Sequence, residues 1–283
     1  MSEEFKKEKR KRGIYLLPNL FTTAALFSGF YAVLAAMNGQ FEQASLAIFV
    51  AMVLDGMDGR VARLTNTQTA FGAEYDSLSD MVAFGLAPSL VIYVWSLNTL
   101  GKLGWLAAFV YTAGTALRLA RFNTQVGTSD KRYFQGLPSP AAAAVIAGSV
   151  WVAVEHDIGG SDLSYLACLL TGLTGLLMVS NFRYSSFKEV DFRGKVPFFS
   201  IVVIMLGFAV VVVQPEFVLF LLFLIYAFSG PVMTLVHLRR RRLERHSAPA
   251  DVEENLNKMR GVKGMDQRKT RISADEDNHP ASK

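Results

Sequence analysis

Apolar residues gather in long blocks, and short polar or charged stretches separate these blocks. Eight blocks of about 18–25 residues are long enough to cross ~30 Å of hydrocarbon as α-helices. They cover residues 14–38, 41–61, 75–98, 103–122, 137–157, 162–182, 196–213 and 216–238. The last two flank the polar "QPE" and also fit a re-entrant pair. The pattern predicts an all-α fold: a polytopic membrane helix bundle of about eight transmembrane helices.

The block pattern leaves no separate soluble domain. It predicts a basic cytoplasmic segment over residues 1–13, a transmembrane domain over 14–238, and a basic, then polar and disordered cytoplasmic tail over 239–283. The first block is too long for a signal-peptide core, so we expect it to be retained. The composition agrees, with 51% hydrophobic and 19% charged residues. The single cysteine, Cys168, falls inside a predicted span as a small buried hydrophobe.

The formal net charge of +5 is concentrated at the ends of the predicted helices. "KKEKRKR" precedes the first block and "RRRRLERH" follows the last, and the basic loops share one side of the membrane (Arg60, Arg63, Arg118, Arg121, Lys131, Arg132, Arg183, Lys188, Arg193, Lys195). The loops on the opposite side contain a single lysine or arginine, Lys102. The positive-inside rule therefore places both termini in the cytoplasm. This placement favours a multi-pass protein of the cell membrane that binds anionic lipids, with no nucleic acid as partner.

Four aspartates interrupt this apolar pattern in "LDGMDGRVARLTNTQTAFGAEYDSLSDMVAFG", residues 54–85. A carboxylate deep in a bilayer costs ~2.5–3.5 kcal/mol on insertion scales. Asp55 and Asp58 share one helical face, and Asp76 and Asp80 share another. A short turn would make the two helices antiparallel neighbours, so we expect the two acidic stripes to converge.

Converging carboxylates without nearby histidine or cysteine suit hard divalent cations such as Mn²⁺ or Mg²⁺. Two such ions ~3.5–4 Å apart can hold a diphosphate. Gly56 and Gly59 would let a nucleotide approach the helix, and Arg63 could grip a phosphate. Two alternatives stay open: the acids neutralise Arg60 and Arg63, or they line the path of a cation-coupled transporter or channel. Such a transporter would be expected to have paired halves, and the chain has one acidic constellation.

The stretch "DGMDGRVAR", eight residues and then "GAEYDSLSD" resembles the signature of the CDP-alcohol phosphotransferases. The resemblance implies that an alcohol displaces CMP from a CDP-linked lipid and forms a phosphodiester. It further implies that Asp55, Asp58 and Asp76 hold two divalent ions, Mn²⁺ or Mg²⁺. The fourth aspartate, Asp80, would also face the metal site and would take the proton of the alcohol.

The same resemblance suggests residues on the nucleotide side. Gly59 and Arg63 match family positions that contact the CDP moiety, and Thr69 sits where a small hydroxyl residue does so. "LPNLFT" resembles the Pro-Asn-x-x-Thr element of the family, which adds Asn19 and Thr22. Alternatively, Asn19 and Thr22 only provide an amide and a hydroxyl at the interface between helices.

Two further segments, "TALRLARFN" (115–123) and "FQGLPSPAAAA" (134–144), resemble the phosphatidylserine synthase branch. This implies transfer of the phosphatidyl group of CDP-diacylglycerol to L-serine, and it implies a homodimer. The serine carboxylate would need a guanidinium, so Arg118 and Arg121 are candidates, with Asn123 beside them. Alternatively, both arginines reach lipid phosphates. A sibling that uses glycerol 3-phosphate, an inositol phosphate or choline is the alternative enzyme.

Overall fold

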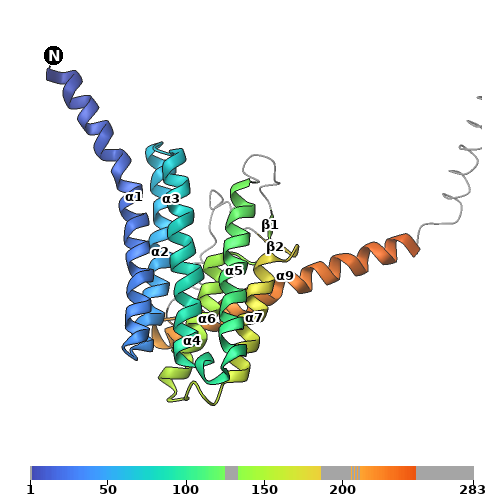
Figure 1. The fold of residues 1–283 in the computed structure, drawn as a ribbon. Helices are drawn as coiled ribbons and strands as arrows, with labels where there is room; N and C mark the ends of the chain where they lie inside the picture. The colour runs from blue at the N-terminus through green and yellow to red at the C-terminus, as the bar shows by residue number, and fades with distance from the viewer. Residues whose placement is uncertain are drawn as a thin grey trace, which may run out of the picture. The chain divides into compact units, whose positions relative to one another are not determined.

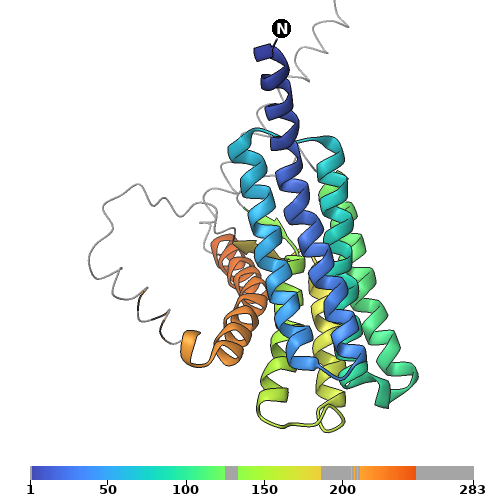
Figure 2. The same ribbon diagram turned by 90° about the vertical axis from the view of Figure 1, so that its left-hand side faces the viewer.

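The computed structural model describes residues 2–124, 133–185, 205, 207, 209 and 211–246. The α-helices of these residues are α1 (Ser2–Met37), α2 (Phe41–Thr65), α3 (Ala70–Asp80), α4 (Ala87–Trp95), α5 (Lys102–Thr124), α6 (Ser139–Glu155), α7 (Ser164–Val179) and α9 (Pro215–His246). The contacts divide the chain into two units, Met1–Met233 and Thr234–Lys283. Within the first unit, α1, α2 and α3 lie side by side (Figures 1 and 2).

The described helices follow the predicted order. The first six predicted blocks correspond to α1, α2, the helix over 70–95, α5, α6 and α7, and the eighth corresponds to α9. Most of the block over 196–213 and the tail after residue 246 lie outside the described residues. The helical architecture is confirmed, with two differences at the ends of the chain: α1 already begins at Ser2, and α9 continues through residues 239–246.

The predicted all-α fold class is confirmed, and one small element was not predicted. The strands β1 (Tyr133–Gln135) and β2 (Arg183–Ser185) form a small antiparallel sheet, with Phe134 opposite Tyr184. These residues follow α5 and α7, which pack against each other and bring the two following segments together. Three-residue strands have no period long enough to be recognised in a sequence.

Four helices among the described residues are long and apolar enough to cross a membrane: Leu17–Met37, Ala70–Trp95, Lys102–Thr124 and Pro215–Val236. The α6 and α7 helices are apolar but shorter. In α2, Glu42 near the start and the charged residues from Asp55 onward leave only residues 43–54 without a charge. The helix that carries Asp55 and Asp58 is therefore not among these four.

Small residues allow the helix backbones to approach closely in the core. Ala141, Ala142, Ala143 and Ala144 on α6 are all buried. On α7, a side chain at Gly175 would meet the backbone of Tyr111, with its Cβ 2.8 Å from the Tyr111 Cα. Membrane helices commonly pack through such small residues, because the lipid gives apolar side chains no strong reason to associate.

The connection between α2 and α3 sets the geometry of the acidic stretch. Asn66 ends α2 in the left-handed conformation, with φ 53°, which asparagine tolerates better than most residues. The side chain of Thr69 then accepts a hydrogen bond of 3.0 Å from the Gly72 N–H and caps α3. Only residues 66–69 separate the two helices, so their acidic ends stay adjacent.

A π-helical segment, η1 (Met81–Leu86), begins directly after Asp80 and joins α3 to α4. Such segments shift the helical phase and often lie at functional sites. Here the hydroxyl of the fully buried Tyr111 on α5 donates a hydrogen bond of 2.9 Å to the Phe84 carbonyl. The phase shift lets α4 bury Val91 and Ile92 in the core while α3 directs its aspartates toward α2.

Candidate functional site

Three of the four aspartates come together between α2 and α3. Carboxylate oxygens of Asp55, Asp76 and Asp80 all lie within 4.8 Å of one another. The Asp76 Oδ1 atom is buried and has no hydrogen-bond partner in the described part of the chain. Three like charges at this distance repel one another strongly unless a cation or a proton lies among them. Oxygen donors at this spacing fit a divalent metal ion.

The fourth aspartate, Asp58, is buried and has a partner of its own. Its Oδ2 atom lies 2.7 Å from the hydroxyl of Thr22 on α1, which also lies 3.1 Å from the Pro18 carbonyl. Asp58 still interacts electrostatically with Asp55 and Asp76. Asp55, Asp76 and Asp80 thus form one group, and the fourth aspartate is hydrogen-bonded to α1.

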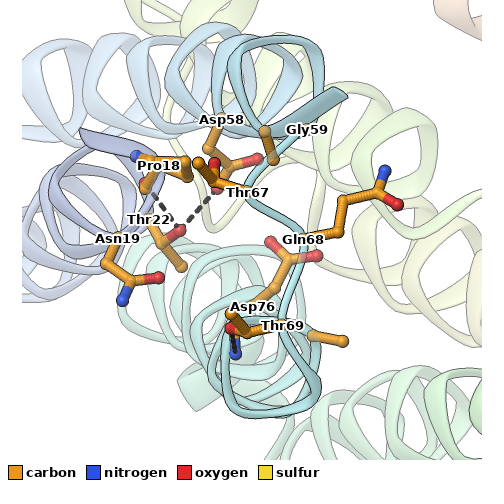
Figure 3. A pocket seen from close by; sticks show the side chains of 12 residues that line it. Pro18, Asn19, Thr22, Asp58, Gly59, Thr67, Gln68, Thr69 and Asp76 are labelled. Atoms are coloured by element: carbon orange, nitrogen blue, oxygen red, sulfur yellow. Dashed lines mark hydrogen bonds between the residues drawn. The ribbon is translucent and has the colours of Figure 1, made fainter. Parts of the chain in front are cut away.

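A pocket of about 260 Å³ opens between α1, α2, α3 and the connection over residues 66–69. Figure 3 shows side chains from all of these elements directed into it, with Asp58 and Asp76 on opposite helices. Its polar lining includes five further residues: Asn19, Thr22, Thr67, Gln68 and Thr69. The pocket therefore combines two carboxylates with amide and hydroxyl groups, the donors and acceptors that a polar ligand needs.

The two glycines of the acidic stretch differ in position. Gly59 lines the pocket, whereas Gly56 is exposed on α2 and lies outside the lining. A Cβ atom added at either glycine would meet nothing within 4 Å. Arg63 is exposed and does not line the pocket. Among the residues proposed on the nucleotide side, Asn19, Thr22, Gly59 and Thr69 are thus brought together, while Gly56 and Arg63 are not among the lining residues.

The candidate acceptor residues lie on α5 and differ in their contacts. The Arg118 Nη1 atom donates a hydrogen bond of 2.8 Å to the Ser139 hydroxyl, and Arg118 interacts electrostatically with Asp80. Arg121 instead donates one of 2.9 Å to the carbonyl of Val179, the last residue of α7. Asn123 exchanges hydrogen bonds with Ser77, the neighbour of Asp76 in α3.

Comparison with known proteins identifies the family. A family model described as CDP-alcohol phosphatidyltransferase matches residues 15–173, which include all four aspartates and both candidate arginines. The chain belongs to the CDP-alcohol phosphatidyltransferase family. The protein is therefore an enzyme. Its several apolar helices and its membrane-protein relatives make it a multi-pass membrane protein.

Several curated relatives of this CDP-alcohol phosphatidyltransferase carry the name CDP-diacylglycerol–serine O-phosphatidyltransferase. The Helicobacter pylori protein is 40% identical over 204 residues, which is 71% of this chain and 84% of the relative. The Methanocaldococcus jannaschii protein is 37% identical and covers 65% of this chain and 80% of the relative. The Bacillus subtilis protein is 34% identical over 61% of this chain and 92% of its own length.

Sequence reasoning missed three groups that the fold of this family member brings to the site. Gln68 and Thr67 line the pocket but stand in the variable stretch between the two acidic motifs, where no pattern marks them. Ser139 is fully buried against Arg118, and only its place in "GLPSPA" distinguishes it. Tyr226 of α9 interacts electrostatically with Arg118, although 108 residues separate the two in sequence (226 − 118 = 108).

Proposed function

We propose that this protein transfers the phosphatidyl group of CDP-diacylglycerol to L-serine and forms phosphatidylserine and CMP. The observation that carries the proposal is the convergence of Asp55, Asp76 and Asp80 beside a polar pocket, with the guanidinium of Arg118 in electrostatic range of Asp80. The names of the relatives from bacteria and an archaeon support serine as the acceptor.

The acidic residues are proposed to hold two divalent metal ions, either Mn²⁺ or Mg²⁺. Asp55, Asp76 and Asp80 would hold it from α2 and α3, and Asp58 would add its carboxylate from the pocket side. The unpartnered Asp76 Oδ1 supports this assignment, because a buried oxygen without a partner is costly. When bound, the metal offsets the negative charge of the diphosphate.

Asp80 is proposed as the general base. The hydroxyl oxygen of serine forms a bond to the phosphatidyl phosphorus, and the bond from this phosphorus to the bridging oxygen breaks. CMP leaves with that oxygen, and the hydroxyl proton goes to a carboxylate oxygen of Asp80. Asp80 suits this role because it does not line the pocket with Asp58 and Asp76 and lies toward Arg118.

The pocket is proposed to bind the CDP moiety through Asn19, Thr22, Gly59 and Thr69. Gly56 and Arg63 are proposed to act at its edge, where the diphosphate would enter. Gly59 supports the assignment, since the space beside it is open and a side chain would reduce it.

Gly59→Leu should raise the KM for CDP-diacylglycerol by about tenfold or more, because an added side chain would occupy part of the pocket. Gly172→Leu is the matched control: Gly172 also lies in a helix and has nothing within 4 Å of an added Cβ, but it lies outside the pocket. Saturation curves for both variants measure the difference. Equal KM values for the two variants would contradict the placement of CDP.

Arg118 is proposed to bind the carboxylate of serine, and its contacts distinguish it from Arg121. A carboxylate that leaves water for a site at membrane depth needs a fixed cation. Each arginine has one buried nitrogen without an acceptor in the described chain, Arg118 Nε and Arg121 Nη1, but Arg118 is held by Ser139 and interacts electrostatically with Asp80. Arg121 is proposed mainly to satisfy the end of α7, where Val179 offers a carbonyl that the helix itself leaves free. Asn123 is proposed to keep α5 beside α3 through Ser77.

Arg118→Lys should raise the KM for serine by about tenfold or more and leave the KM for CDP-diacylglycerol nearly unchanged. Lysine keeps the charge but cannot reproduce the bidentate geometry of a guanidinium. Arg121→Lys should have a much smaller effect on the KM for serine. Ethanolamine, which lacks the carboxylate, should be a very poor acceptor for the wild type. An unchanged KM for serine in Arg118→Lys would overturn the assignment of the carboxylate.

The orientation and assembly are also proposals. The basic residues on one side of the predicted membrane support an active site that faces the cytoplasm, with both termini on that side. The family resemblance supports a homodimer embedded among membrane lipids. Labelling of a cysteine introduced at position 128, between α5 and β1, by a membrane-impermeant reagent in sealed inverted vesicles would test the orientation. Labelling there but not in right-side-out vesicles is expected.

A further inference from the structure

Two serines separate the aspartates of α3 in "DSLSD", residues 76–80. The hydroxyl of the buried Ser79 donates a hydrogen bond of 3.0 Å to the carbonyl of Thr22 on α1. Ser77 accepts one of 3.0 Å from the Nδ2 atom of Asn123 on α5, and its own hydroxyl lies 3.2 Å from the Asn123 Oδ1 atom. One serine therefore ties α3 to α1, and the other ties it to α5.

The two serines flank the acidic face of α3. Successive residues of an α-helix are about 100° apart around its axis, so Asp76 and Asp80 lie about 40° apart. On the same basis, Ser77 and Ser79 lie about 80° to either side of the line midway between the two aspartates. A rotation of α3 about its axis would therefore move both serines away from their partners and change the direction of both carboxylates.

The rest of α3 offers little to prevent such a rotation. Among its 11 residues, all of which the structure describes, only Ser79 is buried. The π segment Met81–Leu86 begins directly after Asp80, so the packing of α4 beyond it does not set the phase of α3. The Tyr75 hydroxyl also lies 3.0 Å from the Thr23 hydroxyl on α1, but this contact is exposed and joins the tip of a long side chain, which can follow a rotation.

Thr22 connects the two helices that carry the aspartates. Its carbonyl accepts the hydrogen bond from Ser79 on α3, and its hydroxyl donates one of 2.7 Å to the Oδ2 atom of Asp58 on α2. Thr22 is itself buried. One residue of α1 therefore holds α2 and α3 at the level of their acidic residues.

We propose that Ser77 and Ser79 are positioning residues that lock the rotation of α3 and keep its two aspartates facing Asp55 on α2. Carboxylate oxygens of these three aspartates lie within 4.8 Å of one another. Like charges at this distance repel, and a helix that is free to turn would separate them. The lock keeps the carboxylates assembled before an ion binds. This inference rests on the metal assignment of the proposed function.

The test is a titration of Mn²⁺ into the metal-free protein for wild type, Ser77→Ala, Ser79→Ala and the double variant. Either hydrogen bond alone still restrains α3, so each single variant should raise the Kd for Mn²⁺ only about threefold, as expected for one lost neutral hydrogen bond. The loss of both should raise it about thirtyfold or more, which exceeds the product of the two single effects.

Ser28→Ala is the matched control. The Ser28 hydroxyl donates a hydrogen bond of 2.8 Å from α1 to the Ala47 carbonyl on α2, and Ser28 lies outside the pocket and the group of three aspartates. This variant should lower the midpoint of thermal unfolding about as much as Ser79→Ala and leave the Kd for Mn²⁺ unchanged. Ser77→Thr keeps the hydroxyl, so Ser77→Thr combined with Ser79→Ala should bind Mn²⁺ as Ser79→Ala alone does.

The outcomes separate the lock from the proposed function. A double variant whose Kd does not exceed the product of the single effects would overturn the lock and leave the proposed function standing. An equal rise in Kd for Ser28→Ala and Ser79→Ala would do the same, because it would show a general effect of helix packing. A wild-type protein that binds no Mn²⁺ would overturn the metal assignment of the proposed function itself.

Discussion

Asp80→Asn is expected to abolish turnover while binding of CDP-diacylglycerol stays largely intact. The amide keeps the shape of the side chain but cannot accept the proton of the serine hydroxyl. A general base typically contributes 10²–10⁴-fold to the rate, so the loss should reach at least about a hundredfold. The pocket itself should change little, because Asp80 is not among its lining residues. Release of CMP and binding of CDP-diacylglycerol, measured on the same preparation, separate the two effects.

Asp58→Asn is the informative comparison for this result. Asp58 lines the pocket and bonds Thr22, so its loss should weaken metal-dependent binding of CDP-diacylglycerol as well as turnover. Asp162→Asn, in an exposed loop between α6 and α7, should change neither. An Asp80→Asn enzyme that keeps more than about a tenth of the wild-type activity would contradict the assignment of the base.

Removal of divalent metal should have an effect as large as that of Asp80→Asn. Activity should be absent in chelator, return with Mn²⁺ or Mg²⁺, and return poorly with Ca²⁺. The larger ion prefers longer bonds and more ligands than a compact group of carboxylates provides. Titration of Mn²⁺ into the metal-free protein should show binding that Asp55→Asn weakens, because Asp55 belongs to the group within 4.8 Å. Full activity in chelator, with no metal bound, would contradict the metal assignment.

The acidic site could be predicted because it depends on helical periodicity. Residues three or four apart share a face, so the spacing of the aspartates alone predicted two facing stripes. The structure places three of them together as expected. It also ties Asp58 to Thr22, which lies 36 residues earlier in the sequence. No local pattern could reveal that contact, because it depends on how α1 packs against α2.

Other features depend on tertiary packing to a still greater degree. Within the π segment after Asp80, the Phe84 carbonyl accepts a hydrogen bond from the hydroxyl of Tyr111 on α5. The sequence of residues 81–86 reads as an ordinary apolar helix. The exposed position of Arg63, outside the pocket lining and within one turn of the end of α2, could not be predicted either, because helical periodicity does not show where the pocket lies along α2.

The choice of acceptor is the central claim, and a competition assay tests it most directly. Wild-type protein in Mn²⁺ with CDP-diacylglycerol would receive equal concentrations of L-serine, glycerol 3-phosphate, an inositol phosphate and choline, and mass spectrometry would identify the lipid product. Phosphatidylserine should form in a 1:1 ratio to CMP and should predominate, and its formation should be lost in Asp80→Asn. A product that consists mainly of phosphatidylglycerol phosphate, or of either other lipid, would contradict the account.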